Sequence, residues 1–233
     1  MAKVTLENLN KIFVSKIGKD VKAVNDFNLL LEDGEILALL GSSGCGKTTT
    51  LRMIAGFETA TSGQIKIGER IVNDLKPADR NVAMAFEGYA LYPPLTVKDN
   101  IAFSLMREKI SKDKVDSKVM EVAELLEITD ILERYPPSIS GGQQQRVSLA
   151  RALVRDSDAL LLDEPMSQLE PQLRAVLRAR VKDYIQHNNK TVIFVTHDQT
   201  EAVALADKIA VMENGDLKQL ASPYEISAKP SNV

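Results

Sequence analysis

The stretch GSSGCGKTTT, residues 41–50, places two glycines at a fixed spacing before a lysine and a run of threonines. It fits the pattern G-x-x-x-x-G-K-S/T, in which glycines allow backbone N–H groups to approach phosphate oxygens closely. The apolar run ILALL, 36–40, precedes it, and the helix-forming TTTLRMIAGF follows it. A strand, a glycine loop and a helix in this order predict an α/β fold with a phosphate-binding loop. The simpler alternative is a glycine-rich turn before a helix.

The predicted loop supplies both a cation and a hydroxyl group for a nucleoside triphosphate. Lys47 would reach the β- and γ-phosphates, and the Thr48 hydroxyl would be a ligand of Mg²⁺. Cys45 is interpreted as a small filler rather than a nucleophile. The residues predicted to bind the nucleotide here are Gly41, Ser42, Ser43, Gly44, Cys45, Gly46, Lys47, Thr48 and Thr49.

Two later apolar runs end in polar residues that suit phosphate chemistry. LLLDEP, 160–165, supplies Asp163 to hold Mg²⁺ through its hydration shell and Glu164 to polarise the attacking water. VIFVTHD ends near His197, whose imidazole could hydrogen-bond the γ-phosphate or that water. Strand ends of this kind also occur as solvated turns, and a lone histidine there can be structural. Because all three runs are expected to end at one edge of a parallel sheet, we favour a shared site.

Composition narrows the class of protein. The 233 residues are 44% apolar and 26% charged, which is typical of a globular chain. The formal net charge of −3 argues against nucleic acid as an obligate partner. No run of about 18 apolar residues occurs, and the N-terminus has no apolar signal segment, so a cytoplasmic location is expected. Cys45 is the only cysteine, which excludes an internal disulfide and a cysteine metal site.

The chain divides into two strand-bearing parts that flank a helical one. Residues 1–87 and 156–233 carry the predicted strands, whereas residues 88–155 carry none. The predicted strands and hairpins are 2–9, 27–31 with a hairpin between them at 12–26, 36–40, 158–164, 191–198, and a hairpin at 208–220 turning at Asn214 and Gly215. A helix is expected at 172–188, and Val115, Val119, Val122 and Leu126 form one apolar helix face that ends before Pro136 and Pro137.

The stretch ISGGQQQR, 139–146, resembles the LSGGQ signature of ABC-transporter ATPases. The order of phosphate loop, helical insert, signature, LLLDEP and VTHD also matches this family over essentially the whole chain. The resemblance implies one nucleotide-binding domain: a P-loop NTPase (RecA-like) core with an N-terminal antiparallel β-subdomain and an inserted α-helical subdomain. YALYPPLTVKDNIAF and THDQTEAVALADKIAVMENG resemble the importers of sugars, polyols and related solutes, and polyamine and ferric-iron importers carry similar stretches.

The resemblance also implies how ATP is held and used. Phe13 matches the aromatic residue that stacks on adenine, although a core phenylalanine is the alternative, and Ala23 is included among the nucleotide contacts. The signature residues Ser140, Gly141, Gly142 and Gln143 would contact the ATP of a second ATPase subunit. In the family, ATP closes this dimer and its hydrolysis releases it. The implied cofactors are ATP and Mg²⁺.

Two residues depart from the family pattern. Glu87 stands where the family places a glutamine; it could still bind Mg²⁺ but lacks the amide N–H donors. Glu170 stands where the loop after LLLDEP usually has an aspartate. These departures motivate an alternative function, a weakly active nucleotide-binding regulatory partner in a heterodimeric pair. A role on nucleic acid or ribosomes is a third reading, but the fused ATPase units or long coiled insertions of such proteins do not occur in the sequence.

The remaining implications concern partners. The helical part is expected to dock two transmembrane permease subunits at the cytoplasmic face of the cell membrane, and thereby to serve a solute-binding protein. The segment 89–101 resembles the stretch that, in the family, forms the groove for a permease helix. The candidate exposed contacts in it are Tyr92, Pro93, Pro94 and Leu95. The alternative is that these residues only pack within the helical part. A sugar, polyol or glycerol-phosphate substrate follows by analogy. The maltose-type ATPases carry a regulatory β-domain that would begin where this chain stops.

Overall fold

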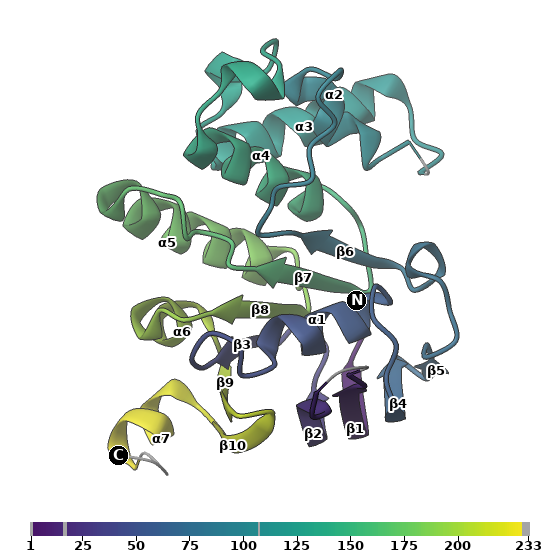
Figure 1. Cartoon of the computed structure of the whole chain (residues 1–233). Helices are drawn as coiled ribbons and strands as arrows, with labels where there is room; N and C mark the ends of the chain where they lie inside the picture. The colour runs from purple at the N-terminus through teal and green to yellow at the C-terminus, as the bar shows by residue number, and fades with distance from the viewer. Residues whose placement is uncertain (1, 16–17, 107, 230–233) are drawn as a thin grey trace.

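A computed structural model describes residues 2–15, 18–106 and 108–229, which form two sheets and a set of covering helices (Figure 1). The strands are β1 (Val4–Phe13), β2 (Val21–Leu31), β3 (Ile36–Leu40), β4 (Ser62–Ile67), β5 (Arg70–Ile71), β6 (Val82–Ala85), β7 (Ala159–Asp163), β8 (Val192–Thr196), β9 (Lys208–Glu213) and β10 (Asp216–Ala221). The helices are α1 (Lys47–Ala55), α2 (Val97–Phe103), α3 (Lys112–Leu125), α4 (Gly141–Leu153), α5 (Pro171–His187), α6 (Gln199–Leu205) and α7 (Pro223–Ala228).

The larger sheet has the strand order β10-β9-β3-β8-β7-β6, and the smaller one has the order β2-β1-β4-β5. In the larger sheet β3, β6, β7, β8 and β9 run parallel to their neighbours, and β10 pairs antiparallel with β9 at the edge. The smaller sheet is antiparallel throughout. The predicted α/β fold, with one antiparallel sheet and one largely parallel sheet, is therefore confirmed.

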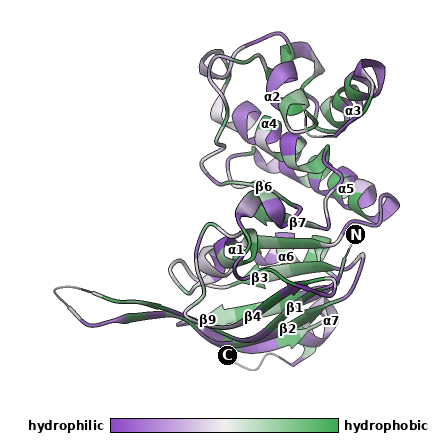
Figure 2. Ribbon diagram, turned by 90° about the vertical axis from the view of Figure 1, so that its right-hand side faces the viewer, coloured by the Kyte–Doolittle hydropathy of each residue, from purple (hydrophilic) through white to green (hydrophobic). Residues whose placement is uncertain are grey.

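The central strands β3, β7 and β8 of the larger sheet are buried on both faces, which explains their apolar sequences. In β7, Leu160 and Leu162 face the cluster formed with α2–α6, whereas Ala159 and Leu161 face the cluster formed with α1 and the smaller sheet. Strands covered on both faces read as continuous apolar runs because neither side-chain row meets water. Figure 2 shows these central strands largely in the hydrophobic colour, while the helices alternate between the two colours.

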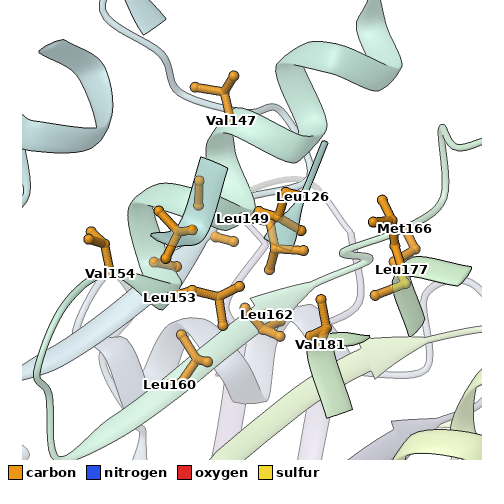
Figure 3. Packing of buried hydrophobic residues seen from close by; sticks show 14 of the residues in the cluster. Leu126, Val147, Leu149, Leu153, Val154, Leu160, Leu162, Met166, Leu177 and Val181 are labelled. Carbon is orange, nitrogen blue, oxygen red and sulfur yellow. The ribbon is translucent and has the colours of Figure 1, made fainter. Parts of the chain in front are cut away.

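Helix α4 joins the helical layer to the sheet. Its residues Leu149 and Leu153 lie in the same buried cluster as Leu160 and Leu162 of β7 (Figure 3). Burial of each such side chain stabilises the fold by about 1.5–3 kcal/mol. The position of α4 relative to β7 is thus defined by close apolar packing, which matters for the polar contacts made at its first turns.

Most expected elements are present, with shifted ends. The run 36–40 is a strand as predicted, the strands at 158–164 and 191–198 are β7 and β8, and the hairpin at 208–220 is formed by β9 and β10 around Asn214 and Gly215. The described residues of 88–155 contain helices and short 3₁₀ turns but no strand. Residues 16–17 of the expected hairpin at 12–26 lie outside the described residues. The same holds for residues 1, 107 and 230–233, which fall within the expected domain parts.

Five of the helices and strands were not predicted from the sequence: β4, β5, β6, α6 and α7. All are short, and β4 and β5 mix polar and apolar residues. β6 has only four residues, VAMA, at the edge of the larger sheet. Within the described residues, none of the helices combines the length and apolar character needed to cross a bilayer.

Candidate nucleotide-binding site

A cleft of about 630 Å³ opens at the carboxyl ends of β3, β7 and β8. These ends meet because parallel pairing sets Leu40 beside Thr196 and Asp163 beside Val195. Open α/β sheets bind ligands outside this edge. The cleft is lined by Ala23, Ser43, Gly44, Gly46, Lys47, Thr48, Thr49, Glu87, Glu164, Ser167, Gln168, Val195 and His197.

The glycine loop between β3 and α1 is tightly enclosed by backbone. Gly46 has a φ of 106°, and a Cβ atom there would collide with the carbonyl oxygen of Ala23. A Cβ atom at Gly41 would collide with the carbonyl oxygen of Met212. Both positions therefore require glycine, because only a residue without a Cβ atom lets the loop pass this close to the backbone of Ala23 and Met212.

Lys47 is the cation of this loop. It is only 6% exposed, and its Nζ donates to the carbonyl oxygens of Gly41 at 2.7 Å and Ser42 at 2.9 Å. Lys47 also begins α1, whose N-cap Gly46 gives no side-chain hydrogen bond. The free N–H groups and the positive dipole end of α1 add to the lysine charge, so this end of the cleft suits an anion.

Thr48, which lines the cleft, contacts the buried Asp163 at the end of β7. The Thr48 Oγ1 donates to Asp163 Oδ1 at 3.0 Å, and Asp163 is 3% exposed. Burial raises the pKa of Asp163, while the hydrogen bond from Thr48 opposes that rise. Because burial disfavours the ionised form of this carboxyl group, a nearby cation would stabilise that form.

The oxygen set fits a partly hydrated Mg²⁺ better than a closed protein cage. Thr48 and Asp163 supply two oxygen ligands or hydrogen-bond acceptors, and Glu87 lines the same cleft. Mg²⁺ keeps several waters and uses one or two carboxylates together with substrate phosphates. Within residues 2–15, 18–106 and 108–229, no group of three or more His, Cys, Asp or Glu side chains forms a metal cluster.

Glu164 and His197 both line the cleft and are in direct contact. The Glu164 Oε1 lies 2.9 Å from His197 Nδ1, with 15% and 67% of the two side chains exposed. Glu164 has a φ of 49°, the left-handed region that a glutamate adopts rarely. The hydrogen bond and the negative charge of Glu164 raise the pKa of His197 above 6.5. A carboxylate that can accept a proton is thereby oriented by an imidazole beside it.

This pair predicts a pH-dependent contact. The pKa of His197 is raised in the folded state, so its contact with Glu164 adds to the free energy of unfolding while the imidazole is protonated. This contribution is complete below pH 6.5 and is lost as the pH rises through the raised pKa. In an NMR titration, the pKa of His197 should fall toward 6.5 in Glu164→Gln. His187 is the only other histidine, so a His187→Gln background leaves one imidazole signal. Equal pKa values with and without the Glu164 carboxylate would contradict the pairing.

The signature residues lie at the start of α4, next to a wall of this cleft: a Cβ atom on Gly142 would lie 3.1 Å from the carbonyl oxygen of Gln168. Ser140 is the N-cap of α4; its Oγ accepts from Gln143 N–H at 3.3 Å, and Gln143 Oε1 accepts from Ser140 N–H at 2.9 Å. Ser140 and Gly141 are exposed, and Gly142 and Gln143 are half-buried. None of the four lines the chain's own cleft.

Phe13, Cys45 and Ala23 occupy different places around the loop. Phe13 ends β1, is 41% exposed rather than in the core, and has Lys11 Nζ 4.8 Å from its ring centroid, but it does not line the cleft. Cys45 is buried beneath the loop, and Ala23 lines the cleft directly. Whether these residues bind a nucleotide stays a prediction.

Sequence reasoning missed three residues at this site. Ser167 and Gln168 follow Glu164 and line the cleft, and Gln145 on α4 hydrogen-bonds to that segment. Gln145 is 3% exposed, but its neighbours Gln144 and Arg146 are polar, so the local sequence carried no signal of its burial. A polar side chain there implies specific hydrogen-bond partners.

Comparisons with known proteins agree with this geometry. Residues 24–167, more than half of the chain, match the family described as ABC transporter. The trehalose/maltose import ATP-binding protein MalK of Thermococcus litoralis is 49% identical, over 100% of this chain and 63% of the relative. The sn-glycerol-3-phosphate import ATP-binding protein UgpC of Brucella abortus is 43% identical, over 100% of this chain and 65% of the relative. The chain thus spans less than two thirds of the length of these curated relatives.

Solved structures extend the agreement to the fold. The ATP-binding cassette MJ0796, in a dimeric post-hydrolysis state bound to ADP and Pi, superposes with a TM-score of 0.87 at 27% identity. That match covers 94% of this chain and 98% of the cassette. Family match, identity to relatives and superposed fold all point the same way, and the chain belongs to the ABC transporter family.

Proposed function

We propose that this chain binds and hydrolyses ATP as the energy-supplying subunit of an ABC importer. The observation that carries the proposal is the single cleft that joins Lys47, the Thr48–Asp163 contact and the Glu164–His197 pair. A cation for the phosphates, oxygen atoms for a metal and a carboxylate for the water are the three requirements of phosphoryl transfer to water.

Each residue then has a distinct role. Lys47 and the N–H groups of residues 43–48 hold the β- and γ-phosphates, and Glu164 accepts the proton of the attacking water while His197 orients the carboxylate and the γ-phosphate. Thr48, Asp163 and Glu87 would hold Mg²⁺, which when bound neutralises phosphate charge. Phe13 would stack on the adenine, with Ala23 beside the loop.

A second subunit would complete the site. Ser140, Gly141, Gly142 and Gln143 do not line the chain's own cleft, yet Ser140 is exposed at the N-terminus of α4, where an anion is favoured. We assign them to the ATP held by a companion subunit. The dimeric cassette MJ0796 supports this arrangement. Binding of ATP would close the dimer, and loss of the γ-phosphate would release it.

The helical part of the chain would meet the permeases. We assign residues 1–87 and 156–233 to the ATPase core with its β-subdomain and residues 88–155 to the helical subdomain. A groove of about 360 Å³ between them is lined in part by Phe86, Tyr89, Tyr92, Phe103 and Arg151. Of the four contacts expected from the sequence, Tyr92 lines this groove, Pro93 and Pro94 are exposed elsewhere, and Leu95 is half-buried rather than exposed.

The partners and location follow from this role. Two permeases in the membrane and a solute-binding protein would select the substrate, with this chain peripheral at the cytoplasmic face. The two relatives named above are import ATP-binding proteins for trehalose/maltose and for sn-glycerol-3-phosphate, which supports a polyhydroxylated solute. Polyamine or iron transport is the alternative substrate class.

The test is ATP hydrolysis by the purified chain with its co-expressed permeases. We expect turnover that requires Mg²⁺, rises when the permeases are present and drives solute uptake into vesicles. Tight ATP binding with negligible hydrolysis would instead favour a regulatory partner in a heterodimer. The observation behind that second candidate is Glu87, which places a carboxylate rather than an amide in the cleft.

Glu87 gives a further prediction. Its charge adds to burial in raising the pKa of Asp163, so it opposes negative charge in the cleft. Without Mg²⁺, Glu87→Gln should tighten ATP binding by about threefold to tenfold, as expected for one fewer like charge near a triphosphate. Titration with a fluorescent ATP analogue measures this change. Glu69→Gln, on the turn between β4 and β5, is the control, and an unchanged or weaker affinity in Glu87→Gln would refute the charge argument.

A further inference from the structure

Helix α4 is tied by one side chain to the loop that carries Glu164. The Gln145 Nε2 donates to the Glu164 carbonyl oxygen at 2.9 Å and to Ser167 Oγ at 3.1 Å. Its Oε1 accepts from the Gln168 N–H at 2.9 Å. The amide group is thus bonded through both of its polar atoms, and all partners lie in the segment 164–168.

Burial makes these hydrogen bonds hard to replace. Gln145 is 3% exposed, so water does not substitute readily for a lost partner. The first turn of α4 also approaches the segment closely, because a Cβ atom on Gly142 would lie 3.1 Å from the Gln168 carbonyl oxygen. A side-chain bridge and a close backbone approach therefore hold α4 and the segment 164–168 in one arrangement.

The segment needs such a restraint at Glu164. Its φ of 49° is unfavourable for a residue with a Cβ atom, so the free backbone would relax to negative φ. Gln145 binds the carbonyl oxygen of this same residue. A change of φ at Glu164 would turn its side chain away from His197 Nδ1, which lies 2.9 Å from Oε1.

We infer that Gln145 is a positioning residue for hydrolysis: it holds the strained Glu164 backbone so that the Glu164 carboxylate faces the attacking water. This inference rests on the proposed ATPase function. The bridge links α4 of the helical layer to the segment that carries Glu164. Gln145 itself touches no substrate, and its effect passes entirely through residues 164–168.

Replacement of Gln145 by methionine removes all three hydrogen bonds and keeps the side-chain length. We expect kcat for ATP to fall by about tenfold to a hundredfold, the range seen when catalytic groups shift by about 1 Å. The KM for ATP should stay within about twofold, because Lys47 and the glycine loop are untouched. Because an unfolded fraction would lower apparent kcat at an unchanged KM, kcat is calculated per nucleotide-binding site, with the sites counted by ATP titration.

Asn73→Leu is a matched control. The Asn73 amide also bridges backbone groups, accepting from Ile65 N–H at 2.8 Å and donating to the Gly63 carbonyl at 3.1 Å, but it does so at β4, and Asn73 does not line the cleft. The Asn73→Leu variant should keep kcat within about twofold of the parental value. Equal losses of kcat in Gln145→Met and Asn73→Leu, or a parental kcat in Gln145→Met, would overturn the inference.

Two further measurements keep the inference testable. Ser167→Ala removes a single partner of Gln145 and should lower kcat by about threefold even if Gln145→Met fails to fold; an unchanged kcat would count against the bridge. Hydrogen exchange of the Gln168 amide should be faster in Gln145→Met than in the parental chain, independent of activity. If the parental chain with its permeases does not hydrolyse ATP, the proposed function fails, whereas an unchanged Gln168 exchange rate refutes the positioning role itself.

Discussion

Glu164→Gln is expected to lower kcat for ATP hydrolysis by about a thousandfold while ATP binding is retained. The substitution keeps the shape of a side chain that is 15% exposed, and it removes the oxygen that accepts a proton. A positioned general base contributes about a hundredfold to ten-thousandfold to a rate. Single-turnover measurements at saturating ATP give the change in kcat directly.

The same variant should accumulate ATP-bound dimers. If ATP closes two subunits and hydrolysis separates them, blocking hydrolysis leaves the closed state as the stable one. Size-exclusion chromatography with ATP should show a dimer for Glu164→Gln and a monomer for the parental chain after turnover. Glu35→Gln is the control, because Glu35 pairs with Lys208 at 2.8 Å at the amino end of β3. Parental turnover in Glu164→Gln would remove Glu164 from its role.

The sequence predicted the central strands well for a physical reason. β3, β7 and β8 are covered on both faces, so their apolar runs stand out from the surrounding polar sequence. β6 belongs to the same sheet, but its four residues, VAMA, are too short and too small to form a pattern. β4 was missed because SGQIKI lies in the antiparallel sheet and mixes exposed and buried positions.

The residues of the candidate site also fall into a predictable and an unpredictable group. The placement of Lys47, Asp163, Glu164 and His197 was predictable because each ends or follows a strand of one parallel sheet, and the carboxyl ends of such strands meet at one edge. The role of Gln145 was not predictable from the sequence. Its hydrogen-bond partners depend on how α4 packs on β7, and no local sequence pattern encodes that packing. The roles of Phe13 and the signature residues stay predictions, since none of these residues lines this chain's own cleft.

Lys47→Ala should weaken ATP binding by about a hundredfold or more. The Nζ group already makes two hydrogen bonds of 2.7 and 2.9 Å to loop carbonyls, so it is held at the phosphate end of the cleft. A hydrogen bond to a charged group contributes about 1.5–3 kcal/mol, and two such bonds to phosphate oxygens correspond to at least a hundredfold in Kd. Titration with a fluorescent ATP analogue measures the affinity without requiring turnover.

Lys190→Met separates this effect from the general loss of a buried cation. Lys190 is 7% exposed, close to the 6% of Lys47, and its Nζ donates to the Arg155 carbonyl oxygen at 3.0 Å. It lies just before β8, at the opposite end of that strand from His197. We expect Lys190→Met to lower thermal stability and leave ATP affinity within about twofold. If both variants bound ATP equally, whether tightly or weakly, Lys47 would not be the residue that recognises the phosphates, and the cleft would have to bind its anion through the backbone of α1 alone.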